Sequence, residues 1–508
     1  MRRKCGHMKL EFEDYLSETD NIYDLVGNCF GLLCENIDNH QAFIGEYISI
    51  GNKRKGKNNP NYEKLQIFSN NIMKLLQDYK PSKYEKIRNN ILREVEELEL
   101  DPYQEHKKNC LTVIYSILSA IDACAMEWNT KWMHRELGPL DRQGKTCYRV
   151  YFSPRETIHR EYIDEIKRNR ISDSGFFESF ESFRFVDEEG WSQKIGTPRI
   201  KFISIPEHIK GKLREEKKLK IAVIPAPEEK NFSFDEVKGA GIRVKYYQPQ
   251  NSLLINKICE GVEIAIQEGA HMIMLPEYVV EPAIYEAIRS CLVKTRSNLE
   301  KKDYLLALFA GSTWTEDDNN KMSILDAEGN LLGEYYKYSP FVKKDKRTHS
   351  YECYEALSNP GKKCDLIAIE DIGVILPAIC RDVIDGVYTE KLIKTLLPVF
   401  IMIAAWSSSV ASFEVRQREY ACKYFTSTVL CNACGAVDAK KDKIGNGSIV
   451  VKKDTIADCN IRSIQRYSCE GGCCKEGVCL YIMEYTFSGC KDNDITVHKY
   501  LVSGEEES

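Results

Sequence analysis

Short apolar runs of strand length alternate with stretches of helical periodicity in the sequence after Leu219. Residues 220–224 and 271–275 are two of these runs, and the segment 252–268 between them carries apolar side chains every three or four positions. This alternation is typical of an α/β architecture, in which helices connect neighbouring strands. Reactive side chains in such folds gather at one edge of the sheet, so a functional site is expected where the predicted strands end.

Three side chains of complementary chemistry occupy such positions. Glu277, Lys337 and Cys380 each end or closely follow a predicted strand. A thiol needs a base to become a thiolate, and a carboxylate crowded by apolar groups gains the proton affinity to act as that base. An ammonium group can hold the negative oxygen of a tetrahedral intermediate. The three together predict thiol-based acyl chemistry.

Cys380 is predicted to lie at a turn between a strand and a helix, because residues 388–397 after it have helical spacing. The N–H groups at a helix start favour a thiolate and an oxyanion. A buried structural cysteine is the alternative, and for Cys380 taken alone it is favoured, because the chain has 20 cysteines and cysteine is among the most buried residue types. Glu277 and Lys337 upstream favour the functional interpretation.

With these motifs in order, residues 219 to about 455 resemble the nitrilase superfamily of carbon–nitrogen hydrolases. The matching motifs are Lys-Ile-Ala-Val-Ile at 220–224, Met-Leu-Pro-Glu at 274–277, Ala-Gly-Ser at 310–312, Tyr-Lys at 336–337, Ile-Cys-Arg-Asp at 379–382, Asn-Ala-Cys-Gly at 432–435 and Gly-Ser-Ile-Val at 447–450. The resemblance implies an α/β fold of the α-β-β-α sandwich type. It also implies a homodimer or a larger homo-oligomer.

The resemblance assigns expected roles to individual residues. Glu277 would be the general base, Lys337 would stabilise the oxyanion, and Cys380 would attack an amide or nitrile carbon to form a thioester. The backbone N–H of Arg381 would complete the oxyanion site. Many family members use a second glutamate between the lysine and the cysteine, for which Glu355 is the candidate here.

Further positions near the motifs have alternative roles. Glu352 is the alternative to Glu355 as the second glutamate. Trp406, just past a predicted strand, is expected either to line the substrate pocket or to belong to the core. Arg381 stands where the family often has an aromatic or aliphatic residue. Its positive charge is expected to lower the pKa of Cys380 and to suit an anionic substrate. The segment 228–250 is longer than the usual first loop of the family.

The leading functional prediction is hydrolysis of a non-peptide carbon–nitrogen bond in a small molecule, an amide before a nitrile. One alternative is acyl transfer, in which the same thioester passes to an amine. The other is a ligand-sensing or regulatory module with a protein partner at the N-terminal domain. Proteins of bacterial defence systems are among the family members with added domains, so an antiviral defence role is conceivable.

The first part of the chain has a different pattern. Residues 1–135 show apolar periodicity of three and four with breaks between segments, which predicts a helical domain. Residues 136–218 form a mixed connecting region, and the main boundary before the 219–500 domain is expected in the charged run 210–220. The aromatic-rich stretch 176–185 suits either a strand or a partner surface.

Four cysteines are concentrated near the C-terminus. Glycines between Cys469, Cys473, Cys474 and Cys479 would let the sulfurs surround one thiophilic ion, and four thiolates suit zinc. The spacing differs from paired Cys-x-x-Cys knuckles, so free thiols in a redox-active loop are the default prediction. No cofactor is otherwise expected.

Composition excludes some classes of partner. The net charge of −5 gives no expectation of nucleic-acid binding, and no apolar stretch approaches a clean membrane span of about 20 residues. The first residues lack the apolar core of a signal peptide, so the cysteines are expected to be reduced thiols of a cytoplasmic protein.

Overall fold

The structure is a computed structural model, and it forms two compact units. One unit comprises residues 1–155 and 162–193, and the other comprises residues 156–161 and 194–508. The residues that the structure describes are 19–36, 62–77, 79–98, 106–125, 148–152, 180, 183–187, 196–216, 218–225, 232–237, 241–246, 252–295, 304–344, 351–370, 372–424, 426–436, 447–450, 464–467, 477–486 and 495–503.

The first unit combines helices with a short antiparallel strand pair. Its elements are α2 (Ile22–Asn36), α4 (Tyr62–Leu76), the 3₁₀ turn η2 (Pro81–Lys83), α5 (Tyr84–Glu97), α6 (His106–Ala125), β1 (Tyr148–Phe152) and β2 (Phe183–Asp187). The helices pack through the apolar stripes that the sequence periodicity predicts. In α5, for example, Tyr84, Ile87, Ile91 and Val95 are buried.

The described phenylalanines of the aromatic-rich stretch 176–185 belong to the core of this first unit. The rings of Phe30 and Phe185 are stacked, with centroids 3.7 Å apart, and the ring of Phe180 lies edge-on to Phe30 at 6.1 Å. Phe183 is also buried. The alternative of an exposed partner surface is therefore wrong for Phe180, Phe183 and Phe185. Strand β2 places Phe183 and Phe185 in the core, and the Phe180 ring packs against Phe185 with centroids 5.5 Å apart.

The second unit is an α/β structure. Its elements are β3 (Pro198–Ile203), α9 (Glu207–Glu216), β4 (Lys218–Val223), β5 (Phe232–Val237), β6 (Gly241–Tyr246), α10 (Ser252–Gln267), β7 (Met272–Met274), α11 (Pro282–Thr295), β8 (Ala307–Trp314), β9 (Asn320–Leu325), β10 (Leu331–Tyr336), β11 (Val342–Lys344), β12 (Tyr351–Tyr354), β13 (Cys364–Ile369), β14 (Gly373–Ile379), α12 (Arg381–Asp385), α13 (Val387–Leu396), β15 (Phe400–Ala405), α14 (Ala411–Tyr424), β16 (Ser427–Asn432), η6 (Cys434–Ala436), β17 (Gly447–Val450), β18 (Ile464–Tyr467), β19 (Gly477–Thr486) and β20 (Ile495–Ser503).

Two parallel three-stranded segments form the centre of this unit. Strands β4, β7 and β8 are parallel neighbours joined by α10 and α11, and β14, β15 and β16 repeat the arrangement with α12, α13 and α14. The antiparallel strands β9, β10 and β13 connect the two segments within one continuous sheet. Strands β14, β15 and β16 are buried along their whole length, which explains the nearly uninterrupted apolar sequences of β14 and β15.

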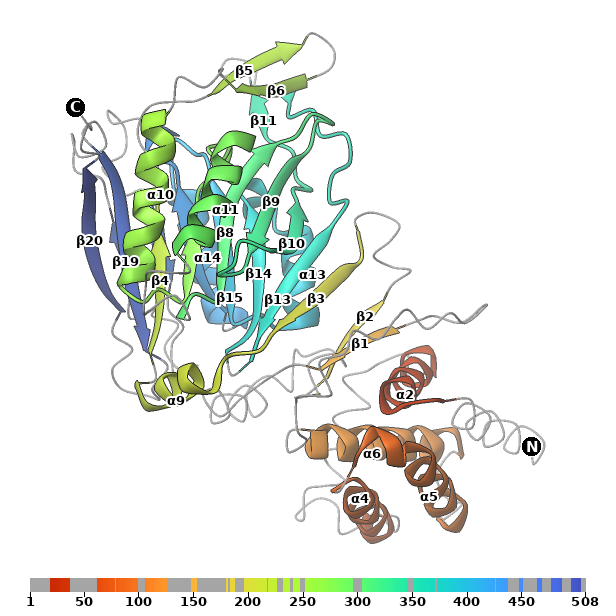
Figure 1. Ribbon diagram of the computed structural model, residues 1–508. Coiled ribbons are helices and arrows are strands. Elements are labelled where there is room, and N and C mark those ends of the chain that lie inside the picture. Colours follow the sequence, from red (N-terminus) through yellow and green to blue (C-terminus); the bar gives the residue numbers. More distant parts are fainter. Residues whose placement is uncertain are drawn as a thin grey trace. The chain divides into compact units, whose positions relative to one another are not determined.

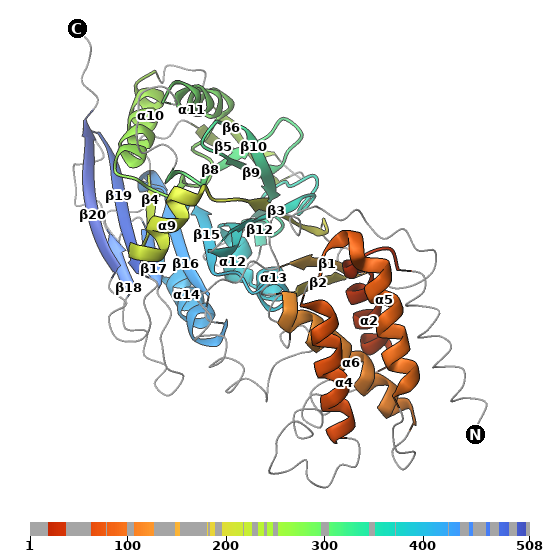
Figure 2. The same cartoon turned by 60° about the horizontal axis from the view of Figure 1, so that its bottom comes forward.

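The two segments face each other as the middle layers of a sandwich. Helices α10 and α11 form the outer layer on one side, and α13 and α14 lie on the other (Figures 1 and 2). A backbone hydrogen bond of 3.4 Å from Glu277 N, after β7, to Ala405 O, at the end of β15, joins the layers. The predicted α-β-β-α sandwich is confirmed.

The region 136–218 is divided between the two units. Strand β3 pairs in parallel with β13, and Lys210 in α9 forms a 2.7 Å ion pair with Glu370. Strand β3 precedes the charged run 210–220, and α9 overlaps it. Both nevertheless belong to the second unit, whose boundary with the first lies between Gln193 and Lys194. Long-range strand pairing therefore places the boundary earlier than the composition of the sequence indicates.

The predicted cysteine cluster lies mostly outside the described residues. This is the case for Cys469, Cys473 and Cys474, while Cys479 falls in β19 without a described side chain. Strand β19 pairs with β4 and with β20, so this part of the chain extends the sheet beyond the motifs. Among the described helices, none has the length and apolar character needed to cross a bilayer.

Candidate active site

Glu277 lies in a tight turn after β7. Ser312 N donates to Pro276 O at 3.1 Å, and Ser312 Oγ accepts from Tyr278 N at 3.2 Å, so the end of β8 fixes the turn. Gly311 is required there because a Cβ would overlap with Pro276 O and because its φ is +66°. Tyr278 also has a positive φ of 63°, which is uncommon for an aromatic residue.

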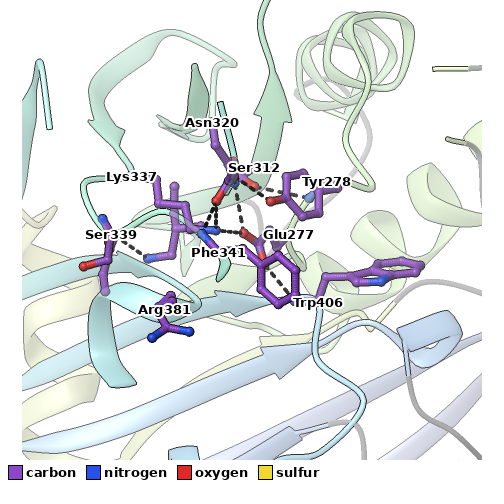
Figure 3. Close-up of polar contacts among 12 residues, drawn as sticks. Glu277, Tyr278, Ser312, Asn320, Lys337, Ser339, Phe341, Arg381 and Trp406 are labelled. Atoms are coloured by element: carbon purple, nitrogen blue, oxygen red, sulfur yellow. Dashed lines mark hydrogen bonds and ion pairs between the residues drawn. The ribbon is translucent and has the colours of Figure 1, made fainter. Parts of the chain in front are cut away.

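Lys337 lies immediately after β10, between two carboxylates. Its Nζ is 2.7 Å from Glu277 Oε1 (Figure 3) and 2.7 Å from Glu355 Oε2. Lys337 and Glu277 are each 1% exposed, and Glu355 is 5% exposed. Of the two sequence candidates for the second glutamate, Glu355 lies in the cluster. The side chain of Glu352, in β12, is outside the described residues.

Asn320 and Tyr278 hold the two carboxylates in place. Asn320 Nδ2 donates to Glu277 Oε1 at 2.9 Å and to Glu355 Oε1 at 3.1 Å. Tyr278 OH donates to Glu355 Oε1 at 2.6 Å, and Phe341 N donates to Glu355 Oε2 at 2.8 Å. Asn320 and Tyr278 were not among the predicted site residues. Their proximity to the predicted motifs was the only available signal.

Cys380 connects β14 to α12. Its φ of 44° and ψ of −102° are outside the regions that L-residues normally adopt, which costs about 1–3 kcal/mol. The backbone is held there by Cys380 N, which donates to Ala404 O at 2.7 Å. The thiol shares a hydrogen bond with the Glu277 carboxylate and a further one with Trp406 N. Cys380 is 6% exposed, so a small part of it is open to solvent.

The electrostatics of the cluster follow from its burial. Burial raises the pKa of Cys380 well above its usual value, and the neighbouring Glu277 carboxylate raises it further, while Lys337 opposes the change. Burial also raises the pKa of Glu277, which Lys337 opposes and Glu355 supports. Burial disfavours a charge on Lys337, but the two carboxylates outweigh this effect and raise its pKa. An ammonium between two acidic groups is therefore the stable form.

Arg381 does not act on Cys380 as predicted. Its Nε donates to Asp385 Oδ2 at 3.0 Å, one helical turn further on, and its side chain is 28% exposed. The positive charge is therefore offset locally and screened by water. The expected lowering of the Cys380 pKa is wrong, because burial and the Glu277 carboxylate raise it instead.

Trp406 contributes through both its backbone and its ring. Trp406 N donates to Glu277 Oε2 at 2.9 Å (Figure 3). The Trp406 ring packs against Phe232 with centroids 4.7 Å apart. The Trp406 side chain is partly buried among the aromatic residues Phe232, Tyr246, Tyr278 and Trp314. It therefore packs with the core beside the site, and its lining of a substrate pocket remains a prediction.

The hairpin β5–β6 accounts for part of the long segment noted in the sequence. Phe232, at its start, is fully buried between the rings of Trp406 and Tyr278. Polar contacts attach the hairpin to the rest of the unit, among them a hydrogen bond of 2.8 Å from Trp314 N to Tyr246 OH. Ala356 N donates to Ile242 O at 2.9 Å, and Arg243 forms a 2.7 Å ion pair with Asp318. The hairpin thus packs against residues that hold Glu277 and Glu355.

Asp382 joins the end of the Lys337 strand to the Cys380 turn. Its Oδ1 accepts from Ser339 N at 2.7 Å and from Tyr338 N at 3.2 Å, and its Oδ2 accepts from Tyr335 OH at 3.1 Å. Asp382 is fully buried, and burial raises its pKa to about 8 against the opposing effect of Lys337. Its place in the motif Ile-Cys-Arg-Asp was visible in the sequence, but its bonding was not.

No protein-family model matches the sequence, and no curated protein matches it. The chain is similar to solved amidases of the nitrilase superfamily. The amidase from Nesterenkonia sp. has 14% identity and a TM-score of 0.35, over 53% of this chain and 90% of that chain. A mutant of the Nesterenkonia AN1 amidase from the nitrilase superfamily has 15% identity and a TM-score of 0.33, over 46% and 83%.

The NitFhit protein of C. elegans has 17% identity and a TM-score of 0.37, over 53% of this chain and 61% of that chain.

Proposed function

We propose that the second unit hydrolyses a non-peptide carbon–nitrogen bond of a small molecule, an amide before a nitrile, through a thioester on Cys380. The observation that carries this proposal is the hydrogen-bonded contact of a thiol, a carboxylate and an ammonium in one buried cluster. A purely structural cluster would need neither the unusual backbone of Cys380 nor a third charged group beside an already paired lysine.

Glu277 would begin the reaction by accepting the proton of the Cys380 thiol. Its raised pKa makes it a stronger base than a solvated carboxylate. The sulfur then attacks the amide carbon, and the carbonyl oxygen gains negative charge. Lys337 Nζ and the backbone N–H of Arg381 would stabilise this oxygen.

Collapse of the tetrahedral intermediate breaks the carbon–nitrogen bond. Glu277 returns its proton to the leaving nitrogen, so ammonia or an amine departs and the acyl group stays on the sulfur as a thioester. Water then gives a proton to Glu277 and attacks the thioester carbon, which releases the carboxylic acid and restores the thiol. Glu355 and Asn320 would keep Lys337 and Glu277 in position throughout.

Intact-mass spectrometry after exposure to a library of amides tests the proposal. The wild-type chain should gain the mass of an acyl group, and Cys380→Ala and Glu277→Gln should not. Cys364→Ala is the matched control, because Cys364 is another buried cysteine of the same unit, in β13, and its loss should leave the adduct unchanged. An adduct that survives Cys380→Ala would overturn the assignment of the nucleophile.

Product analysis distinguishes hydrolysis from acyl transfer. Release of ammonia together with a free acid, without an added amine, is expected for a hydrolase. A thioester that persists in water and disappears only when an amine is added would instead show an acyltransferase.

A further inference from the structure

Two cysteines away from the candidate active site lie against each other on neighbouring helices. Cys259 belongs to α10 and Cys291 to α11, and their side chains share a hydrogen bond. The Sγ of Cys291 is also 3.7 Å from the carbonyl oxygen of Cys259. The proposed hydrolysis does not use either thiol.

The two thiols have different surroundings. Cys291 is 5% exposed, and its Sγ donates to Glu263 Oε1 at 3.4 Å and lies 3.9 Å from Thr295 Oγ1. Cys259 is partly exposed. The interaction with Cys291 lowers the pKa of Cys259, while burial and the Glu263 carboxylate oppose this change and Lys294 supports it. The same interaction together with burial raises the pKa of Cys291.

Such an arrangement separates an attacking thiol from a resolving thiol. A reactive cysteine of the redox type is accessible, has thiolate character and lies beside a second cysteine. Cys259 meets the first two conditions and Cys291 provides the third. The neighbouring Glu263 carboxylate can accept the proton that Cys291 must lose.

We propose that Cys259 and Cys291 form a modification site that low-molecular-weight disulfides oxidise to an intramolecular disulfide. Cys259 thiolate attacks the reagent disulfide, forms a mixed disulfide and expels one thiolate. Cys291 then loses its proton and attacks the Cys259 sulfur, which expels the second thiolate and closes the protein disulfide. The reagent gains the two electrons that the protein thiols lose.

The location gives the site a structural consequence. Helix α10 leads into β7, and α11 begins shortly after the Glu277 turn. A bond between Cys259 and Cys291 would therefore join the two helices that flank this turn in the chain. The oxidation itself does not depend on the proposed hydrolase activity.

Peptide mapping of the full, reduced chain after exposure to oxidised glutathione tests the site. Remaining thiols are blocked by alkylation before digestion, so that disulfides do not exchange. We expect a linked peptide containing Cys259 and Cys291 in the native protein, and its loss after treatment with a dithiol reductant. The variant Cys364→Ser is the control and should give the same linked peptide, because Cys364 is buried in β13.

Single variants separate the roles of the two thiols. Cys291→Ser should accumulate a glutathione adduct on Cys259, about tenfold more than Cys259→Ser accumulates on Cys291, because reactivity follows thiolate character and access. Circular dichroism verifies that each variant is folded. A wild-type chain that keeps the glutathione adduct on Cys259 without forming the link overturns the proposal. So does a link that forms only in denaturant.

Discussion

At the scale of single residues, the site depends on one lysine that neutralises two buried carboxylates. Lys337 is within 2.7 Å of both Glu277 and Glu355, and water does not replace it because all three side chains are buried. Removing one member of a buried ion pair leaves the other charge unpaired, which costs more than the pair contributes. Lys337 therefore matters for stability as well as for the proposed chemistry.

Lys337→Met should lower the free energy of unfolding by about 3–5 kcal/mol, because it leaves two adjacent carboxylates in a buried site. It should also abolish acyl adducts on Cys380. Chemical denaturation and intact-mass spectrometry measure the two effects. Lys321→Met is the control, because the Lys321–Glu334 pair is partly exposed and its loss should cost about 1 kcal/mol. Equal losses in both variants would contradict the interpretation.

Asp382 should make stability depend on pH. Its pKa is about 8 in the folded chain and near its ordinary value of 3.8 in the unfolded chain. Between these values the unfolded chain has lost the proton that the folded chain keeps, so raising the pH favours unfolding. The stabilising effect is fully present below pH 3.8 and is lost as the pH rises through about 8.

Asp382→Asn removes this titration. Compared with the variant, the wild-type chain should lose on the order of 5 kcal/mol of unfolding free energy between the two pKa values, since each pKa unit corresponds to about 1.4 kcal/mol. Denaturation series at several pH values measure the two slopes. Parallel slopes for wild type and Asp382→Asn would show that another group is responsible.

At the scale of elements, the site is built from the ends of several strands and from one hairpin. Glu277 follows β7, Lys337 follows β10 and Cys380 follows β14, and the sandwich brings these ends together. The hairpin β5–β6 adds Phe232 to the aromatic residues that surround Trp406 and the Glu277 turn. The hairpin should therefore affect the reactivity of Cys380 without touching substrate.

Phe232→Ala tests this role of the hairpin. Loss of its ring contacts with Trp406 and Tyr278 should cost about 3–5 kcal/mol of unfolding free energy. Alkylation of Cys380 by iodoacetamide should change roughly tenfold or more, because Trp406 N donates to Glu277 and Tyr278 OH donates to Glu355. Phe234→Ala is the control, since Phe234 is 42% exposed on the same hairpin and shares the ring contact with Tyr278, whereas Phe232 also packs against Trp406. A Cys380 rate that is the same in both variants would exclude the hairpin from the site.

At the scale of the whole molecule, the chain contains two units with separate cores. The core of the first unit includes Phe30, Phe180 and Phe185, and the described contacts of Glu277, Lys337 and Cys380 are all made by residues of the second unit. The chemistry of the second unit should therefore tolerate damage to the core of the first.

Phe30→Ala should destabilise the first unit by about 3–5 kcal/mol, because it removes a fully buried ring stacked on Phe185. The rate of Cys380 alkylation should stay at the wild-type value under native conditions. Ile67→Ala is the control, because Ile67 is 60% exposed and its loss should change neither quantity. A lower Cys380 rate in Phe30→Ala alone would show that the two units are coupled.

The order of strands and helices in the second unit could be predicted, because the buried face of each element determines the spacing of its apolar residues. Runs such as residues 271–275 and 373–379 are apolar since both faces of their strands are covered, and the turns after them carry Glu277 and Cys380. The helical character of α5 followed from the same reasoning. The aromatic stretch 176–185 could not be assigned from the sequence. Its pattern does not show whether the rings pack inside the first unit or face a partner.

The sequence by itself determined the α/β class and the chemical types of Glu277, Lys337 and Cys380, because these depend on neighbours within a few residues. Only the tertiary structure decided that Asn320 and Tyr278 hold the carboxylates, that Asp385 offsets Arg381, and that the pKa of Cys380 is raised. Hydrogen bonds and burial between segments far apart in the chain set these properties. A local sequence pattern does not identify such contacts, because each segment could pack against many other segments of the chain.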